Sequence, residues 1–123
     1  DFLTLLLQTK QGNSESASQL HHALPTYEPW QQTWANYTLG IALLDKNTSD
    51  SRNKALLHLA NVASLHPEDQ PWLTAAAMLK LSEELEDDGF FDQSERISFE
   101  AKQLYPSHPL VLKLKEEERN FIQ

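Results

Sequence analysis

Residues 75–108 read AAAMLKLSEELEDDGFFDQSERISFEAKQLYPSH and contain two helix-forming segments separated by a glycine. Gly89 can adopt the left-handed backbone conformation that ends a helix. Pro106 ends the second segment, because the residue before a proline disfavours the helical conformation. The stretch therefore predicts a helix–turn–helix unit, with helices over about 71–87 and 91–105. Apolar residues recur at helical spacing in the second helix, at Ile97, Ala101 and Leu104.

Two further copies of this unit precede it. Pro29, Pro67 and Pro106 are spaced 38 and 39 residues apart. A small residue stands twelve residues before each proline, apolar or aromatic residues stand five and two before it, and Gly or Asp stands seventeen before it. Agreement at four offsets in three copies indicates an internal repeat of helical pairs. The matching residues are Ala17, Ala55 and Ser94; Leu24, Val62 and Ala101; Tyr27, Leu65 and Leu104; and Gly12, Asp50 and Gly89.

Local signals mark where the helices begin and end. Gly12 is a second candidate for the left-handed conformation, and Asp50 can take the place of glycine in the middle copy. Asp92, followed three residues later by Glu95, predicts a capping box at the start of a helix. Pro71 suits the first turn of the next helix, where its missing N–H costs nothing.

Together these signals predict an all-α chain, because no segment alternates with the period of two that strands show. We expect one domain over 1–123, with repeats at about 1–30, 31–69 and 70–107 and a capping helix at 108–122. Residues from Asn47 to Arg52 are expected to form a polar loop. The predicted helices are 1–11, 14–27, 31–45, 52–66, 71–87, 91–105 and 108–122.

The unit over 75–108 places residues of a recognisable pattern at Met78, Leu81, Ser82, Leu85, Gly89, Phe91, Ser94, Ser98, Ala101, Leu104 and Pro106. The middle copy does so at Leu39, Gly40, Leu43, Ala55, Leu59, Val62 and Pro67. This pattern resembles the tetratricopeptide repeat family. The resemblance implies a right-handed superhelical stack of about three repeats, with a concave groove that binds peptides or protein surfaces. HEAT-like and other solenoids of helical pairs remain alternatives.

The composition favours a protein partner. The chain has 10 Lys and Arg against 18 Asp and Glu, a formal net charge of −8, and no cysteine. An acidic surface repels nucleic-acid phosphates and anionic lipid, so we expect neither as a partner and expect a protein or peptide with basic residues. The longest apolar run, Phe2 to Leu7, is too short to insert across a bilayer. Nothing in the sequence predicts a cellular compartment.

The helix over 31–45 is apolar on two opposite faces, which indicates that one of them is free for a partner. Ala35, Leu39, Ala42 and Leu43 form the face expected to pack inside its own repeat. The other face begins at Trp34, and acidic residues extend it. An alternative is that Trp34 and Tyr37 only fill the seam between repeats. The predicted partner-binding residues are Phe2, Leu6, Trp34, Tyr37, Ile41, Leu44, Leu79, Glu83 and Glu86.

No constellation of residues predicts catalysis, and we expect neither an enzyme nor a bound cofactor. Residues 84–95 resemble a calcium-binding loop in spacing, although Glu is longer than the Asp or Asn that its first ligand positions favour. The same residues are explained by the repeat turn, so a calcium module is the last alternative. The histidines lack metal-site spacing, and His58 and His108 are expected on the surface.

A second alternative is a self-associating assembly or a structural module of a larger protein. The final helix carries apolar residues that can cover the last repeat or pair with a second copy. Terminal repeats need a cap over their apolar face, so capping is the expected role. These residues are Leu110, Val111, Leu114, Phe121 and Ile122.

Overall fold

The computed structural model describes residues 1–65, 68 and 70–122, with Ile122 described by its backbone alone. None of these residues lies in a strand, so the all-α prediction is confirmed. No helix in the described part of the chain has the length and apolar character needed to cross a membrane. The α-helices are α1 (Phe2–Lys10), α2 (Ser14–Ala23), α3 (Pro29–Lys46), α4 (Ser49–Leu65), α5 (Pro71–Asp87), α6 (Phe91–Leu104) and α7 (Pro109–Ile122), and the 3-10 turn η1 (Leu24–Thr26) follows α2.

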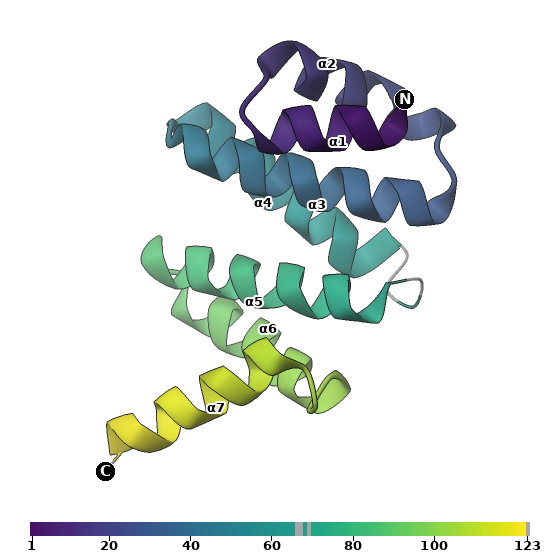
Figure 1. The fold of residues 1–123 in the computed structure, drawn as a ribbon. Helices are drawn as coiled ribbons and strands as arrows, with labels where there is room; N and C mark the ends of the chain where they lie inside the picture. The colour runs from purple at the N-terminus through teal and green to yellow at the C-terminus, as the bar shows by residue number, and fades with distance from the viewer. Residues whose placement is uncertain (66–67, 69, 123) are drawn as a thin grey trace.

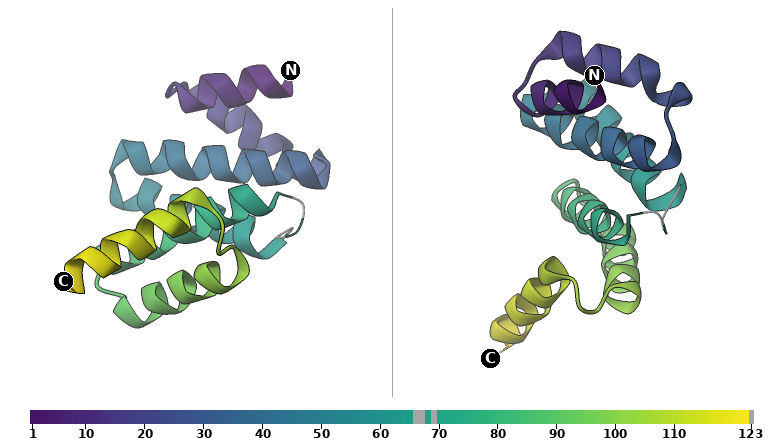
Figure 2. Two further views of the ribbon diagram at one scale, coloured as in Figure 1. Left: turned by 60° about the horizontal axis from the view of Figure 1, so that its bottom comes forward. Right: turned by 45° about the vertical axis from the view of Figure 1, so that its right-hand side comes forward.

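Neighbouring helices along the chain pack as pairs: α1 with α2, α3 with α4, and α5 with α6 (Figures 1 and 2). The first helices of the pairs also contact one another in order, since α1 packs on α3 and α3 packs on α5. Helix α7 continues this row by packing on α5. The two chain termini therefore lie at opposite ends of the molecule (Figure 1).

Capping residues explain most helix boundaries. The N–H of Thr4 donates to Asp1 Oδ1 at 2.9 Å at the start of α1, and Asn13 caps α2 in the same way. Gly12 and Gly89 have φ of +96° and +87°, which confirms the predicted left-handed turns. His66 and Pro67, used in the sequence prediction, lie outside the described residues.

The predicted start of the fourth helix was wrong. Asn47, and not Asp50, takes the left-handed conformation, with φ of 55°, and ends α3. Thr48 and Ser51 then cap α4 reciprocally: the N–H of Ser51 donates to Thr48 Oγ1 at 3.1 Å, and the N–H of Thr48 donates to Ser51 Oγ at 3.2 Å. This hydroxyl pair starts the helix at Ser49, so the predicted loop over Asn47–Arg52 is shorter and Asp50 is helical.

The capping box predicted at Asp92 and Glu95 is also absent. Helix α6 begins at Phe91, and its N-cap residue, Phe90, makes no side-chain capping bond. The backbone of Phe90 instead closes the turn, since its N–H donates to the carbonyl of Leu85 at 2.8 Å. The Schellman-type turn around Gly89 therefore sets where α6 starts, and Asp92 falls inside its first turn.

Two apolar clusters hold the pairs together. One centres on Leu20, Ala35 and Leu39, and the other on Leu59, Val62, Ala77 and Leu81. Ala35 and Leu39 therefore pack on the preceding helices α1 and α2, which corrects the prediction that they face α4. Gly40 contributes to the contact with α4, since a Cβ atom there would lie 2.9 Å from the Leu59 side chain. A helix inside a row has packing neighbours on three sides. Two opposite apolar faces therefore do not show that one of the faces is free to bind a partner.

Candidate functional site

A groove of about 910 Å³ runs between α5, α6 and α7, with Tyr37 of α3 at its edge. Four residues of the predicted binding set line it: Tyr37, Leu79, Glu83 and Glu86. Figure 2 shows how α7 lies alongside the α5–α6 pair, and this placement makes α7 the third wall. The volume is near the upper end of the range of about 300–1,000 Å³ that is usual for ligand sites.

The apolar walls of the groove come mainly from residues that sequence reasoning did not assign to it. Phe91 and Phe99 of α6 line it and are 65% and 62% exposed. Leu110 and Leu114 of α7 face them across the groove. The signal available in the sequence was two phenylalanines eight residues apart on one helix, away from its apolar positions Ile97, Ala101 and Leu104. Which cavity they reach depends on where α7 lies.

Tyr37 is the polar anchor at the edge of this groove. Burial raises the pKa of its hydroxyl above 10.0, with nearby Lys80 opposing the shift. The phenol is therefore uncharged at neutral pH and can donate a hydrogen bond to a bound segment. Tyr37 also packs against the cluster around Leu59, so both interpretations made from the sequence describe part of its environment.

The groove is lined by more carboxylates than cations. Lys102 of α6 and Glu118 of α7 form an ion pair across it, with Nζ–Oε1 at 2.7 Å. Lys80 lies 3.7 Å from Glu83. Within the described residues, three carboxylates that line the groove have no cation within ion-pair distance: Glu86, Glu95 and Glu117. One lining cation, Lys113, likewise has no carboxylate within that distance in the described part of the chain.

The other predicted binding residues lie outside this groove. Phe2 and Leu6 are half-buried against the cluster around Leu20, and the Phe2 ring packs edge-on against Tyr27 at 4.9 Å. Ile41 and Leu44 are half-buried against the cluster around Leu59. These four side chains fill the spaces between neighbouring helices, because the row of first helices is close-packed.

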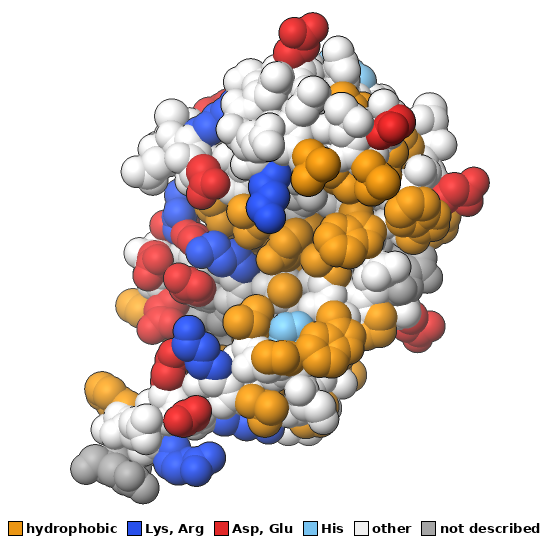
Figure 3. All heavy atoms as spheres, viewed as in Figure 1, with side chains coloured by type: hydrophobic (Ala, Val, Ile, Leu, Met, Phe, Trp, Pro, Cys, Tyr) orange, Lys and Arg blue, Asp and Glu red, His pale blue; other side chains and the backbone are white. Residues whose placement is uncertain are grey.

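Trp34, on α3, is not among the residues that line the groove. The side chains of Trp30, Trp34 and Trp72 are 47%, 39% and 61% exposed. Figure 3 shows apolar side chains gathered in a band over α1, α3 and α5, with charged side chains beside it.

The acidic segment over 84–95 is held by an ion-pair network. Arg52 of α4 donates from Nε to Asp88 Oδ1 at 3.1 Å and from Nη2 to the carbonyl of Glu84 at 3.0 Å, and it also pairs with the Glu84 carboxylate. Lys80 lies 3.4 Å from the same carboxylate. Within the described residues no three His, Asp or Glu side chains are arranged to hold a metal ion. The segment therefore ties α4 to α5.

Both histidines expected on the surface are buried. His58 is 8% exposed and its Nδ1 donates to Asn36 Oδ1 at 2.8 Å, because an amide oxygen can only accept. Burial, and secondarily the nearby His21, lower the pKa of His58 to about 4. His108 is also 8% exposed and donates from Nε2 to the carbonyl of Trp72 at 2.9 Å. The surface assignment was wrong because tertiary contacts cover both side chains. His58 lies against Asn36 of α3 and His21 of α2, and His108, in the turn before α7, lies against Trp72 of α5.

Comparison of the chain with protein-family models, with curated proteins and with solved structures finds no match. The groove combines apolar walls, a phenol and carboxylates that have no ion-pair partner within the described residues. No nucleophile and base lie within hydrogen-bonding distance of each other among the groove residues described above.

Proposed function

We propose that the chain is a tetratricopeptide-like scaffold, a right-handed stack of about three helical pairs, that holds a segment of another protein in the groove between α5, α6 and α7. The observation that supports this most directly is the groove itself, at about 910 Å³ with Phe91 and Phe99 exposed on one wall. Exposed aromatic side chains around a concave surface are typical of peptide-binding sites. The chain acts by binding and not by catalysis.

The expected occupant carries both apolar and basic residues. Phe91, Phe99 and Leu110 offer apolar contact, so aliphatic or aromatic side chains of the partner bury area against them. Glu86, Glu95 and Glu117 have no ion-pair partner in the described chain, so lysine or arginine of the partner neutralises them. An acidic or purely apolar segment would leave these carboxylates uncompensated.

The test is selection of random peptides on the immobilised full chain, followed by measurement of the enriched peptides by fluorescence anisotropy. We expect enriched sequences that combine apolar residues with Lys or Arg. Phe99→Ser should weaken binding by about tenfold or more, because truncating an aromatic hot spot costs about 2 kcal/mol. Glu86→Lys with Glu117→Lys should also weaken it.

The matched control is Glu15→Lys on α2, an exposed acidic residue away from the groove that undergoes the same charge change. Binding should be unaffected by this substitution. Failure to enrich any sequence, or equal affinity for the wild type and both groove variants while they remain folded, would overturn the proposed function.

A further inference from the structure

Two neighbouring helices of the row begin with the same pair of residues. Helix α3 begins Pro29–Trp30 and α5 begins Pro71–Trp72, and Trp34 lies one turn after Trp30. The N-terminal ends of α3 and α5 lie on the same side of the molecule (Figure 1). Because α3 packs on α5, the repeated start places exposed indole rings on adjacent helices. We call these three side chains the tryptophan edge.

Contacts within the chain hold two of these exposed rings in place. The Trp30 ring packs edge-on against Phe2, with ring centroids 5.6 Å apart. The Trp72 ring lies 4.8 Å from the ring of His108, whose Nε2 donates to the carbonyl of Trp72. An aromatic side chain that is already held loses little conformational freedom when a partner covers it, so such rings are effective anchors for binding.

Acidic residues lie beside the starts of both helices. Glu28 directly precedes Pro29, and Glu68 lies in the turn before α5. Both are exposed and form no ion pair among the residues that the structure describes. Figure 3 shows Asp or Glu side chains along the right-hand edge of the apolar band, with Lys and Arg on its other side. One carboxylate outweighs the partial charge of about +0.5 at a helix N-terminus, so this edge is negative.

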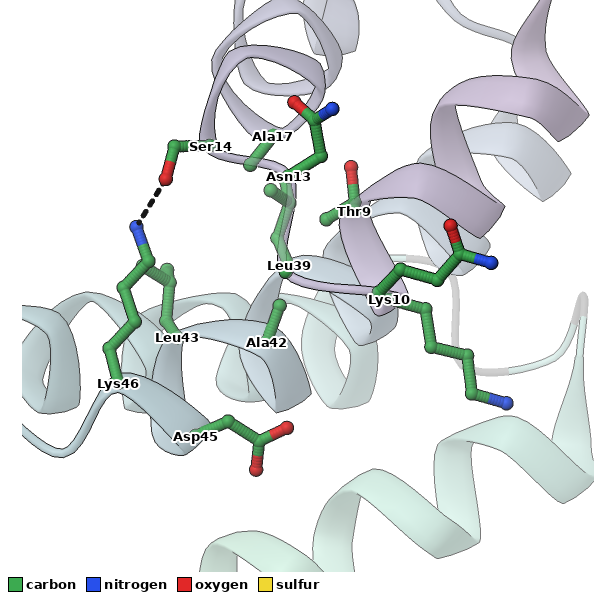
Figure 4. A pocket seen from close by; sticks show the side chains of 12 residues that line it. Thr9, Lys10, Asn13, Ser14, Ala17, Leu39, Ala42, Leu43, Asp45 and Lys46 are labelled. Atoms are coloured by element: carbon green, nitrogen blue, oxygen red, sulfur yellow. Dashed lines mark hydrogen bonds between the residues drawn. The ribbon is translucent and has the colours of Figure 1, made fainter.

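The lysines of α1 and α3 lie at the opposite ends of these helices. Lys10 and Lys46 line a small pocket of about 270 Å³, where the turn between α1 and α2 crosses the C-terminal half of α3 (Figure 4). Lys46 is 16 residues after Trp30, which places the two about 24 Å apart along α3. Neither lysine can therefore neutralise the acidic residues beside the tryptophan edge.

We propose that the tryptophan edge binds an extended segment of another protein that carries two arginines three residues apart. A guanidinium group is planar and always charged, so it stacks on an indole ring while its N–H groups donate to a carboxylate. Packed helices lie about 8–10 Å apart, and a polyproline-type chain advances about 9 Å in three residues, so one arginine falls on α3 and the next on α5. The tryptophans do not line the α5–α7 groove, so this proposal and the proposed function can fail independently.

The test uses the hexapeptide Arg-Pro-Pro-Arg-Pro-Pro, with blocked ends, and NMR titration of the full chain. The chain has three tryptophans, and each gives one indole N–H resonance that reports on the edge directly. We expect saturable shifts of all three resonances. Replacing both arginines of the peptide by lysine should weaken binding by about threefold or more, because an ammonium group stacks less well on indole. Arg-Pro-Arg-Pro-Pro-Pro, with the same composition, should also bind more weakly.

Variants of the chain locate the site. Trp72→Ala should weaken binding of the hexapeptide by about tenfold, as expected for an aromatic anchor. Glu28→Gln keeps the length of the side chain and removes its charge, and should weaken binding by about threefold. The matched controls are Phe121→Ala, an exposed aromatic residue on α7, and Glu15→Gln, an exposed acidic residue on α2. Both controls should bind as the wild type does, and so should the groove variant Phe99→Ser.

Absence of saturable indole shifts, or equal affinity for the arginine and lysine peptides, would overturn the proposal. So would loss of binding in Phe99→Ser with binding retained in Trp72→Ala, because the peptide would then occupy the groove. Indole shifts that appear when the chain alone is concentrated would assign the edge to a second copy. A blue shift of tryptophan emission with phosphatidylcholine vesicles, without a response to the peptide, would assign it to a membrane surface, and either result would overturn the proposal.

Discussion

At the scale of single residues, buried polar groups differ in whether they have a hydrogen-bond partner. The pair His58 and Asn36 is satisfied, since the imidazole donates to the amide oxygen and the amide nitrogen donates to the carbonyl of Gln32 at 3.0 Å. Thr9 has no such partner. A satisfied pair adds to stability, and an unpaired hydroxyl subtracts from it.

Thr9→Val should therefore raise the free energy of unfolding by about 1 kcal/mol, because it removes an unpaired buried hydroxyl without changing the shape of the side chain. Thr33→Val is the matched control and should lower the same quantity by about 1 kcal/mol, because it removes a hydrogen bond that is made. Urea denaturation of the ligand-free chain measures both. A loss of stability in Thr9→Val would show that its hydroxyl has a partner in solution.

His58 should make the fold acid-sensitive. Its pKa is about 4 in the fold and 6.5 in the unfolded chain, so the unfolded state takes up the proton first as the pH falls. The stabilisation is therefore fully present above pH 6.5 and is lost between pH 6.5 and about 4, by up to about 3 kcal/mol. His58→Gln should flatten the stability profile in this window. Parallel profiles for both proteins would contradict the assignment.

At the scale of secondary-structure elements, ion pairs of Arg52 join α4 to the C-terminal end of α5. Glu84 has a side chain only 10% exposed, and Arg52 is its partner from the neighbouring pair. Removing Arg52 leaves the largely buried Glu84 carboxylate with Lys80 as its ion-pair partner, and the loss of compensation costs more than the pair contributes when intact. Surface pairs on the same helix have no comparable effect.

Arg52→Met should lower the free energy of unfolding by about 2 kcal/mol, a value discounted from the buried-pair range because Arg52 is one-quarter exposed. Lys54→Met, two residues along α4, breaks the exposed pair with Asp50 and should change stability by less than about 0.5 kcal/mol. Thermal and urea unfolding compare the two. Adding Glu84→Gln should recover part of the loss in Arg52→Met, and no recovery would show that the lost stability is not electrostatic.

At the scale of the whole molecule, the net charge of −8 and the three uncompensated groove carboxylates act in the same direction. Both attract a basic segment over distances that salt can screen, whereas the contacts with Phe91 and Phe99 are insensitive to salt. The two contributions can therefore be separated by ionic strength. The balance between them decides how a partner is selected.

Raising the salt concentration from about 50 mM to about 500 mM should weaken binding of a selected basic peptide by about tenfold without abolishing it. The Glu86→Gln, Glu117→Gln double variant should bind more weakly at low salt and show a smaller dependence on salt. Fluorescence anisotropy of the same labelled peptide measures both proteins. Equal salt dependence would place the basic residues of the peptide elsewhere on the surface.

Helix α7 also bears on the state of the whole molecule. Val111 is fully buried, which fits a cap, whereas Leu110, Leu112 and Phe121 are 44%, 53% and 91% exposed. We expect the chain to sediment as a monomer across micromolar to millimolar concentrations, because three exposed side chains of α7 offer little area for a stable dimer. A concentration-dependent mass that Leu112→Glu abolishes would instead favour self-association as the function.

Much of the local structure was readable from the sequence, because it depends on residues close together in the chain. The helix–turn–helix unit over 75–108 and the left-handed turns at Gly12 and Gly89 belong to this class. The errors arose where two local signals competed. Asn47 ends α3 in place of Asp50, and the backbone turn at Gly89 starts α6 in place of a capping box at Asp92 and Glu95. Both alternatives satisfy the same backbone groups, so the sequence alone did not separate them.

The tertiary structure alone decided what each helix face contacts. Periodicity shows that the two faces of α3 are apolar. It does not show that Leu39 packs on the preceding pair or that Ile41 packs against the cluster formed by α4 and α5. The sequence-based prediction also placed His58 on the surface and did not assign Phe99 to the groove. Burial and cavities depend on side chains that come together from distant parts of the chain. A repeat pattern specifies how each helical pair forms, but it does not specify how the last helix packs on the pairs before it.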